Sequence, residues 1–229
     1  MLTGVCMLVA ASGGCSGPKA PSDAYNPVVS PANFVSTIDS PFFPLTPGTT
    51  FVYESDTPEG VERIEVMVTH ETKSILGVTC TVVRDTVTLD GELKEDTLDW
   101  YAQDRDGAVW YFGEDSRTYE NGVEVSTEGS WEAGVDGALP GVIMQANPQV
   151  GAPYRQEYYV GVAEDMAQVI SLDQPVTVAF GSFQNCLETK EFTPLEPGVV
   201  AYKFYAAGIG HVLSVEGDVR EELIAVESE

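Results

Sequence analysis

Residues 97–111 read TLDWYAQDRDGAVWY, and this stretch decides the fold class of the chain. Two runs rich in aromatic and apolar residues, 98–103 and 108–112, flank the dipeptide Asp106-Gly107. Asp-Gly is a preferred sequence for a tight hairpin turn because both residues tolerate the positive φ that such a turn requires. The stretch therefore predicts two antiparallel strands joined by a short turn.

The same pattern of strand, turn and strand recurs on both sides of this stretch. Asp90-Gly91 lies 16 residues before Asp106-Gly107, and Asn121-Gly122 lies 15 residues after it. The segments between these turns carry the β-branched and aromatic residues that favour strands. They cover residues 92–103, 108–120 and 123–130. This spacing predicts an antiparallel meander.

The rest of the chain has similar strand signals and no helical period longer than two turns. Further strands are predicted at residues 49–55, 61–69, 79–89, 153–161, 163–172, 175–180, 183–192, 199–206, 211–216 and 220–226. Residues 131–147, with three glycines and no clear period, are predicted as an ordered loop or a short helical turn. The fold class is all-β, and we expect a single curled sheet or barrel-like domain with an acidic exterior and an apolar interior.

Composition limits the kinds of partner that the chain can bind. Of its 229 residues, 36 are acidic and 11 are basic, which gives a net charge of −25. Such a charge repels phosphate backbones, so we expect no nucleic-acid partner. A hydrophobic content of 43% is enough to form a core.

The N-terminal segment indicates export. Residues 1–11 are apolar, and small residues lead to Cys15, which is followed by a Pro- and Ser-rich run. This resembles a bacterial lipoprotein signal, in which the cysteine is lipidated. We expect a signal segment over residues 1–15, a flexible tether over 16–40 and one β domain over 41–229, anchored to the membrane at Cys15 in the cell envelope. No Lys or Arg precedes Cys15, so simple cleavage and an unprocessed N-terminus stay open.

Two further cysteines, Cys80 and Cys186, lie in strand-like sequence. Exported proteins fold in an oxidising compartment, so a disulfide between them is expected. In the loop-entropy model, a bridge closing a loop of about 100 residues stabilises a protein by at most about 4 to 5 kcal/mol. The alternative is two separate buried thiols.

Several longer motifs resemble a widespread family of uncharacterised bacterial exported proteins and lipoproteins. They are PFFPLTPGTTFVYE from residue 41, DWYAQDRDGAVWYFGED from residue 99, GSWEAGVDGALPGVIM from residue 129, and the tail segments FGSFQNCLETKE and YKFYAAGIGHV. The resemblance implies a secreted or lipid-anchored β-sheet protein. It carries no established activity and therefore no catalytic residue.

Candidate residues for chemistry are few. There is no nucleophile elbow, zinc-protease helix, phosphate loop or Cys/His metal spacing in the sequence. Asp99 and Glu114, on neighbouring hairpin arms, form the best pair for a carboxylate-dependent envelope hydrolase. Asp104 and Asp106, which precede Gly107, could supply oxygens to calcium in a structural or adhesive domain. The alternative for these two is a plain hairpin turn, with no cofactor.

Aromatic residues offer a ligand-binding face. Trp100, Trp110, Trp131 and Tyr158 could line a concave surface for a small apolar molecule or a glycan. Adjacent strand residues point to opposite faces, so the alternative is core packing and cross-strand pairing. We favour a monomeric, non-enzymatic protein that binds a ligand or an envelope protein, and we expect its pocket to hold few titratable groups with shifted pKa values.

Overall fold

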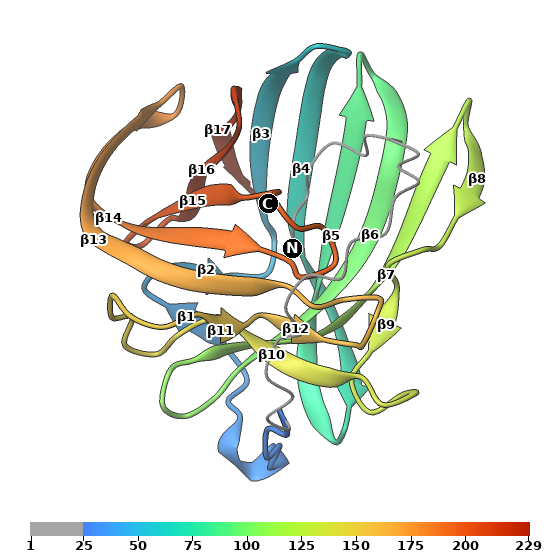
Figure 1. The fold of residues 1–229 in the computed structure, drawn as a ribbon, viewed down its shortest axis with the longest axis vertical. Helices are drawn as coiled ribbons and strands as arrows, with labels where there is room; N and C mark the ends of the chain where they lie inside the picture. The colour runs from blue at the N-terminus through green and yellow to red at the C-terminus, as the bar shows by residue number, and fades with distance from the viewer. Residues whose placement is uncertain (1–24) are drawn as a thin grey trace.

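The computed structural model describes residues 25–229, and nearly all of its regular structure is β (Figure 1). In chain order the elements are η1 (Pro31–Asn33), β1 (Ile38–Ser40), β2 (Phe43–Leu45), β3 (Thr49–Thr57), β4 (Gly60–Ile75), β5 (Val78–Leu89), β6 (Glu92–Gln103), β7 (Val109–Glu120), β8 (Val123–Ser126), β9 (Trp131–Glu132), β10 (Leu139–Met144), β11 (Tyr154–Arg155), β12 (Glu157–Tyr158), β13 (Met166–Val178), β14 (Gly181–Phe192), β15 (Ala201–Ala206), β16 (Gly210–Glu216) and β17 (Val219–Ser228). The all-β class expected from the sequence is confirmed.

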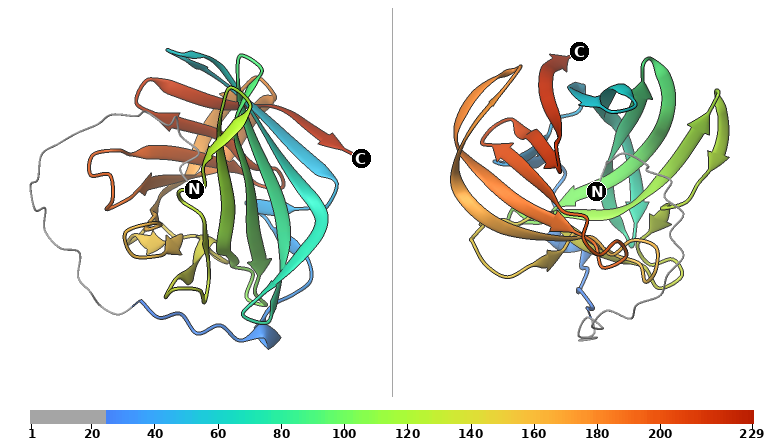
Figure 2. Two further views of the ribbon diagram at one scale, coloured as in Figure 1. Left: turned by 90° about the vertical axis from the view of Figure 1, so that its right-hand side faces the viewer. Right: turned by 45° about the horizontal axis from the view of Figure 1, so that its top comes forward.

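Fifteen of these strands form one antiparallel sheet that curls into a nearly closed barrel (Figures 1 and 2). Its order is β11-β13-β14-β15-β16-β17-β3-β4-β5-β6-β7-β10-β12, with β8 and β9 each paired to β7. The strands at the two ends of this order, β11 and β12, have two residues each and follow one another in the chain. The last strand, β17, pairs with the first long strand, β3, so the ends of the domain meet in the middle of the sheet.

The predicted turns are confirmed at two of three places. Asp90-Gly91 and Asn121-Gly122 both have positive φ at both residues, with values of 49° and 84° and of 52° and 74°. They join consecutive strands directly, as the preferred two-residue hairpin turns do. The connection between β6 and β7 is longer. It runs from Asp104 to Ala108, and the Asp104 N–H donates a hydrogen bond to the Ala108 carbonyl oxygen. Within this connection only Gly107 has a positive φ.

The loop predicted over residues 131–147 contains two strands, β9 and β10, which pair with β7. That prediction was wrong because three glycines hide any alternation. One glycine outside the segment makes the pairing possible. A Cβ on Gly113 would lie 2.2 Å from the Trp131 carbonyl oxygen, so only glycine lets the β9 backbone approach β7 there.

The segment before β3 closes one end of the barrel. The Gln103 side chain accepts hydrogen bonds from the backbone N–H groups of Asp39 and Ser40, both at 2.9 Å. The Phe43 ring contacts Tyr101 on β6 and Tyr205 on β15, with centroid distances of 5.4 and 6.5 Å, and so bridges two distant walls. Residues before the predicted boundary at residue 41, such as Asp39 and Ser40, therefore bond to the barrel wall. The boundary itself stays a prediction.

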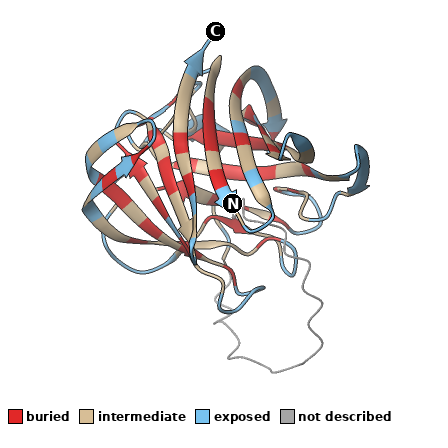
Figure 3. Ribbon diagram, turned by 90° about the horizontal axis from the view of Figure 1, so that it is seen from above, coloured by how far each residue is buried: buried red, intermediate tan, exposed pale blue. Residues whose placement is uncertain are grey.

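Buried and exposed positions alternate along the long strands, as expected for a sheet with one inner face (Figure 3). The inner face holds an apolar core that includes Tyr53, Ile64, Val83, Tyr111 and Leu223. It is not purely apolar, however, since thirteen acidic, amide or hydroxyl side chains and one lysine lie among the buried residues of the described chain. The apolar core expected from the sequence is present, and the charged side chains that lie within it form the candidate site.

No helix in the described part of the chain is long and apolar enough to cross a membrane. Cys15 and the signal segment 1–15 lie outside the described residues, as does most of the first half of the predicted tether.

Candidate functional site

A cavity of about 100 Å³ lies inside the barrel, and the residues of β2 line one end of it. Its wall combines apolar and aromatic side chains, such as Phe51, Ile64 and Val83, with charged ones. The charged members are Asp85, Asp99, Lys203 and Glu221. They reach the cavity from β5, β6, β15 and β17, so strands from both halves of the sheet supply the site.

Carboxyl groups gather on the wall formed by β5, β6 and β7. Asp99 on β6 pairs directly with Glu114 on β7. Asp85 on β5 pairs with Thr97 on β6, and Thr97 lies two residues before Asp99 in the same strand. The Tyr111 hydroxyl donates a hydrogen bond of 2.6 Å to Asp99 Oδ1. Asp85 is only 5% exposed, and its Oδ1 has no hydrogen-bond donor among the described residues. The two acids paired by sequence reasoning, Asp99 and Glu114, are therefore neighbours.

Burial controls the protonation of this wall. It raises the pKa of Asp99 to about 7, although the Tyr111 hydrogen bond lowers it. It raises the pKa of Asp85 well above its usual range, and the charges of Asp99 and Glu95 raise that pKa further. Burial and the charge of Asp99 also raise the pKa of Glu114 well above its usual range. These groups retain protons near neutral pH because burial disfavours their charged forms, and for Asp85 and Asp99 this effect exceeds the opposing charge of Lys203.

The opposite wall, formed by β14 and β15, holds a carboxylate in a different state. Glu191 Oε2 lies 3.1 Å from Lys203 Nζ. Its other oxygen, Oε1, accepts hydrogen bonds from Gln156, Thr189 and Tyr205 at 3.0 to 3.2 Å. Burial is the largest single effect and would raise the pKa of Glu191, but the charge of Lys203 and the hydrogen bonds of Lys203 and Thr189 together lower the pKa to about 2. Glu191 is thus ionised, with an ion pair at one oxygen and three hydrogen-bond donors at the other.

Glu221 and His211 complete the polar lining. Burial raises the pKa of Glu221 to about 7, against the opposing charge of Lys203. Burial lowers the pKa of His211 to about 3, and Lys203 lowers it further, so the imidazole is neutral at pH 7. The Tyr53 hydroxyl donates a hydrogen bond of 3.1 Å to the His211 carbonyl oxygen. The expectation of few shifted groups in the pocket was wrong.

The turn proposed for calcium is tied to the protein itself. Asp104 Oδ1 accepts hydrogen bonds from the backbone N–H groups of Asp106 and Ala108, at 3.0 and 2.9 Å. Its Oδ2 accepts a bond of 2.8 Å from the Trp110 indole. Among residues 25–229, no group of three or more His, Cys, Asp or Glu side chains is placed to hold a metal ion. Both Asp104 oxygens therefore have protein donors, as in a side-chain-capped turn.

The four aromatic candidates do not share one face. Trp100 is buried beneath Lys73, whose Nζ lies 3.3 Å from the ring centroid. Trp131 packs edge-on against Tyr111, whereas Trp110 packs against Phe34 at a different place. Tyr158 contacts the ring of Tyr25, and Arg155 lies over it at 4.1 Å. These rings are packing partners, and the rings that line the cavity are others, namely Phe43, Phe51, Tyr53, Tyr101 and Tyr205.

The disulfide expected between Cys80 and Cys186 is not formed: both are buried free thiols. Cys80 lies on β5 and Cys186 on β14, and five strands separate these two in the sheet (β15, β16, β17, β3 and β4). Burial raises the pKa of Cys80 to about 12 and also raises the pKa of Cys186. Both sulfurs are therefore protonated at neutral pH, which makes them poor nucleophiles.

Sequence reasoning missed Asp85, Lys203 and Glu221, although a usable signal was present. In β15 the residues Ala201, Lys203 and Tyr205 alternate along one face, so a lysine shares the side of the strand with a small and an aromatic residue. Asp85 likewise lies between Val83 and Val87 on one face of β5. A charge inside an apolar alternation marks a buried ionisable group.

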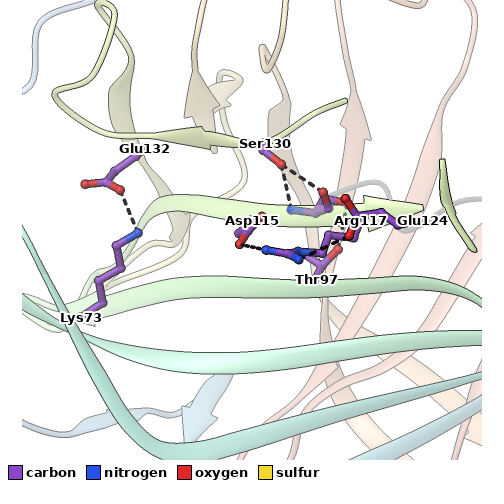
Figure 4. A network of polar contacts seen from close by, with 8 residues as sticks. Lys73, Thr97, Asp115, Arg117, Glu124, Ser130 and Glu132 are labelled. Atoms are coloured by element: carbon purple, nitrogen blue, oxygen red, sulfur yellow. Dashed lines mark hydrogen bonds and ion pairs between the residues drawn. The ribbon is translucent and has the colours of Figure 1, made fainter. Parts of the chain in front are cut away.

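The outer face of the sheet carries ion pairs of an ordinary kind (Figure 4). Arg117 on β7 lies 3.1 Å from Asp115 and 3.3 Å from Glu124, and its side chain is 46% exposed. Lys73 on β4 reaches Glu132 on β9 at 2.8 Å. The contribution of these exposed ion pairs to stability can be compared with that of the buried ion pair inside the barrel.

Comparisons with known proteins give one structural similarity. No protein family model and no curated protein matches it. Among solved structures, it is similar to one described as a "putative lipoprotein" from Parabacteroides distasonis, with 12% sequence identity and a TM-score of 0.44. The match covers 81% of this chain and 98% of the other. The family resemblance of the sequence motifs stays a prediction.

Proposed function

We propose that this protein is a non-enzymatic extracytoplasmic binding protein that takes a small ligand into the cavity of its barrel. The observation that supports this most directly is the cavity of about 100 Å³, whose wall mixes aromatic rings with buried polar groups. Ligand sites in proteins typically combine an apolar lining with a few polar groups that orient the ligand. Asp85 Oδ1 and Ser55 Oγ, both buried, lack hydrogen-bond partners among the described residues.

The size of the cavity favours binding over glycoside hydrolysis. A dry cavity of about 150 Å³ holds one benzene molecule, and this cavity of about 100 Å³ is smaller than that. A sugar ring with its hydroxyl groups is larger than benzene. The Tyr111 hydroxyl also interacts with both neighbouring carboxyl groups: it donates a hydrogen bond to Asp99 and lowers the pKa of Glu114. A small ligand of about four non-hydrogen atoms fits this space better than a substrate flanked by two catalytic acids.

The address of the protein is proposed from its sequence. The apolar residues 1–11, the small residues 12–14 and Cys15 support lipid anchoring at the outer face of a membrane. Expression in a bacterial host should yield a membrane-bound protein whose mass includes the lipid. Cys15→Ser should then lose the lipid, and a protein that keeps the same mass with either residue would contradict the anchor.

The ligand site is tested by thermal melting of the full chain with small probes of three charge types, propylammonium, 1-propanol and propanoate. A probe that binds only the folded state raises stability by roughly 2.7 kcal/mol at 100 times its dissociation constant. We expect at least one probe to raise the melting temperature. Failure of all three at millimolar concentrations would retire the cavity as a ligand site.

A cavity-filling variant shows whether the probe binds inside the barrel. Val83 is 1% exposed and lines the cavity, so Val83→Phe should fill it and remove the probe's effect. Val123→Phe places the same side chain on the surface, where Val123 is 63% exposed, and should leave the effect unchanged. Equal responses of the two variants would place the probe elsewhere.

A further inference from the structure

The balance of charge around the cavity indicates what kind of ligand suits it. Three acids, Asp85, Asp99 and Glu221, line the cavity together with one cationic side chain, Lys203. Lys203 forms its closest ion pair with a fourth carboxylate, Glu191, at 3.1 Å. The described lining therefore holds three carboxyl groups in excess of the pair. A cationic ligand favours the ionised form of these buried carboxyl groups, whereas an anionic ligand would be repelled by each one that ionises.

Asp85 provides the most specific polar feature of this wall. It is 5% exposed, and Oδ1 has no donor within the described protein. A buried acceptor without a donor is destabilising, so a ligand that donates a hydrogen bond to it gains affinity. A ligand that carries N–H donors and a positive charge supplies what Asp85 lacks.

Aromatic rings surround the same space. Tyr53, Tyr101, Tyr205 and Phe51 all line the cavity, and Tyr101 stacks on Tyr111 with centroids 4.9 Å apart. The faces of such rings attract cations, with estimates from about 0.5 to about 2 kcal/mol depending on solvent exposure. The wall thus offers both partners that an organic ammonium group uses, a carboxylate and a π face.

A row of further acids continues from the cavity toward the open end of the barrel. Glu95 and Asp99 alternate with Thr97 along one face of β6, and Thr97 Oγ1 lies 2.8 Å from Glu95 Oε1. Glu62 on β4 is close enough to Glu95 for their charges to interact. The β3–β4 and β5–β6 hairpin turns lie beyond these acids at the same end of the barrel (Figure 1). Clefts lined by one sign of charge concentrate ligands of the opposite sign.

The arrangement suits an organic cation better than a bare metal ion. Calcium takes six to eight oxygen ligands around one point, and residues 25–229 hold no group of three or more candidate metal ligands placed together. The acids are instead spread around an apolar space, so each can meet a different part of a ligand that also has hydrocarbon to bury.

Resting on the proposed function, we propose that the ligand of the cavity is a small organic cation, a protonated alkylamine of about four non-hydrogen atoms. Its ammonium group is held by Asp85 and Asp99, and its hydrocarbon lies against the rings of Tyr53 and Tyr101. Propylammonium and 1-propanol have the same number of non-hydrogen atoms and differ in charge, so they form a matched pair of probes.

Calorimetric titration of the full 229-residue chain at pH 7.5 and low salt tests the proposal, with sodium chloride as the control for ionic strength. We expect propylammonium to bind at least about tenfold more tightly than 1-propanol, because truncating or omitting one partner of a buried charge pair costs 2 kcal/mol or more. Equal affinities would overturn the cation assignment while leaving the cavity as a ligand site. The absence of binding by every probe, propanoate included, would overturn both proposals.

Two variants assign the contact. Asp85→Asn keeps the shape of the side chain and should weaken propylammonium binding by roughly tenfold or more, without changing the affinity for 1-propanol. Asp56→Asn makes the same change at an exposed position of β3 and should leave both affinities unaltered. Unchanged propylammonium affinity in Asp85→Asn would overturn the assignment. If that variant does not fold, the comparison of the two probes on the natural chain still decides.

Discussion

The two walls of the barrel hold buried carboxyl groups in opposite states. On the β14–β15 wall, Glu191 has a lysine at 3.1 Å and three hydrogen-bond donors, and its pKa is lowered to about 2. On the β5–β7 wall, the pKa of Asp99 is raised to about 7 by burial, with one tyrosine donor. Both are almost completely buried, with exposed fractions of 1% and 2%. Burial depth therefore does not decide the protonation state, and the number of partners does.

This difference separates a structural wall from a responsive one. A carboxylate that has a cation and several donors is satisfied without a ligand, so the Glu191 wall holds the barrel together. The acids of the β5–β7 wall lack such partners and change state when a proton or a cation arrives. The following predictions test this contrast, in order of decreasing effect.

Removing the cation from the satisfied wall should have the largest effect. Lys203→Met leaves Glu191 as a buried, ionised group without its ion-pair partner, which typically costs about 3 to 5 kcal/mol. Urea unfolding at pH 7 should show this loss as a lower free energy of unfolding. A loss below about 1 kcal/mol would mean that Lys203 behaves like a surface residue.

A double variant separates the lost pair from lost packing. Replacing both partners, as in Lys203→Met with Glu191→Gln, removes the uncompensated charge and should recover part of the loss. If the double variant is less stable than the single one, the damage arises from packing or from the lost bonds of Gln156, Thr189 and Tyr205 to Glu191.

The responsive wall should make stability depend on pH. Burial raises to about 7 the pKa values of Asp99 on this wall and of two buried acids on other strands, Glu157 on β12 and Glu221 on β17. Carboxyls in unfolded chains have a pKa of about 4. The folded state therefore binds more protons between these values. The stabilisation that these three acids contribute is fully present below about pH 4 and is lost as the pH rises through 7. His211 opposes this, because burial lowers its pKa to about 3 and favours folding as the pH rises toward 6.5.

Three acids outweigh one histidine, so the free energy of unfolding should fall by roughly 3 kcal/mol or more between pH 5 and pH 8. Denaturant titrations across this range measure it. Glu221→Gln should reduce the slope, whereas Glu222→Gln should not, since Glu222 is paired with Arg220 at 2.8 Å. A protein that is equally stable at pH 5 and pH 8 would remove the basis for the responsive wall.

An exposed pair should have the smallest effect. Arg117 bonds Asp115 and Glu124 on the outer face of β7, where water screens all three charges. Arg117→Met should therefore change the free energy of unfolding by less than about 1 kcal/mol. The change in melting temperature caused by Arg117→Met should also depend little on salt concentration. A loss as large as that of Lys203→Met would show that ion pairs inside and outside the barrel contribute alike.

Much of the fold could be predicted from turn chemistry and alternation. Asp90-Gly91 and Asn121-Gly122 marked their hairpins correctly because a two-residue turn requires residues that accept positive φ. The strands β9 and β10 could not be predicted, because their pairing with β7 depends on Gly113, which lies outside their own sequence. The closed floor of the barrel could not be predicted either, since Phe43 meets partners on β6 and β15 that are distant in the chain.

The candidate site was predicted only in part. Asp99 and Glu114 could be paired because they lie on neighbouring arms of one hairpin, and the structure places them opposite each other. The contributions of Asp85, Lys203 and Glu221 depend on barrel closure, which brings β5, β15 and β17 around one cavity. Local sequence indicates that a strand has an inner face, but it does not identify which inner faces meet.

The pairing of β3 with β17 governs when this protein can fold. Seven register pairs, from Glu221 with Ser55 to Ser228 with Thr49, join the start of the domain to its last strand. The sheet cannot be completed until Val219–Ser228 has been synthesised, and contacts so distant in sequence form slowly. A chain that is still incomplete leaves the edges of β3 and β16 unpaired, and such edges recruit other chains. The order of the strands therefore makes protection of these edges necessary until the whole chain has been synthesised.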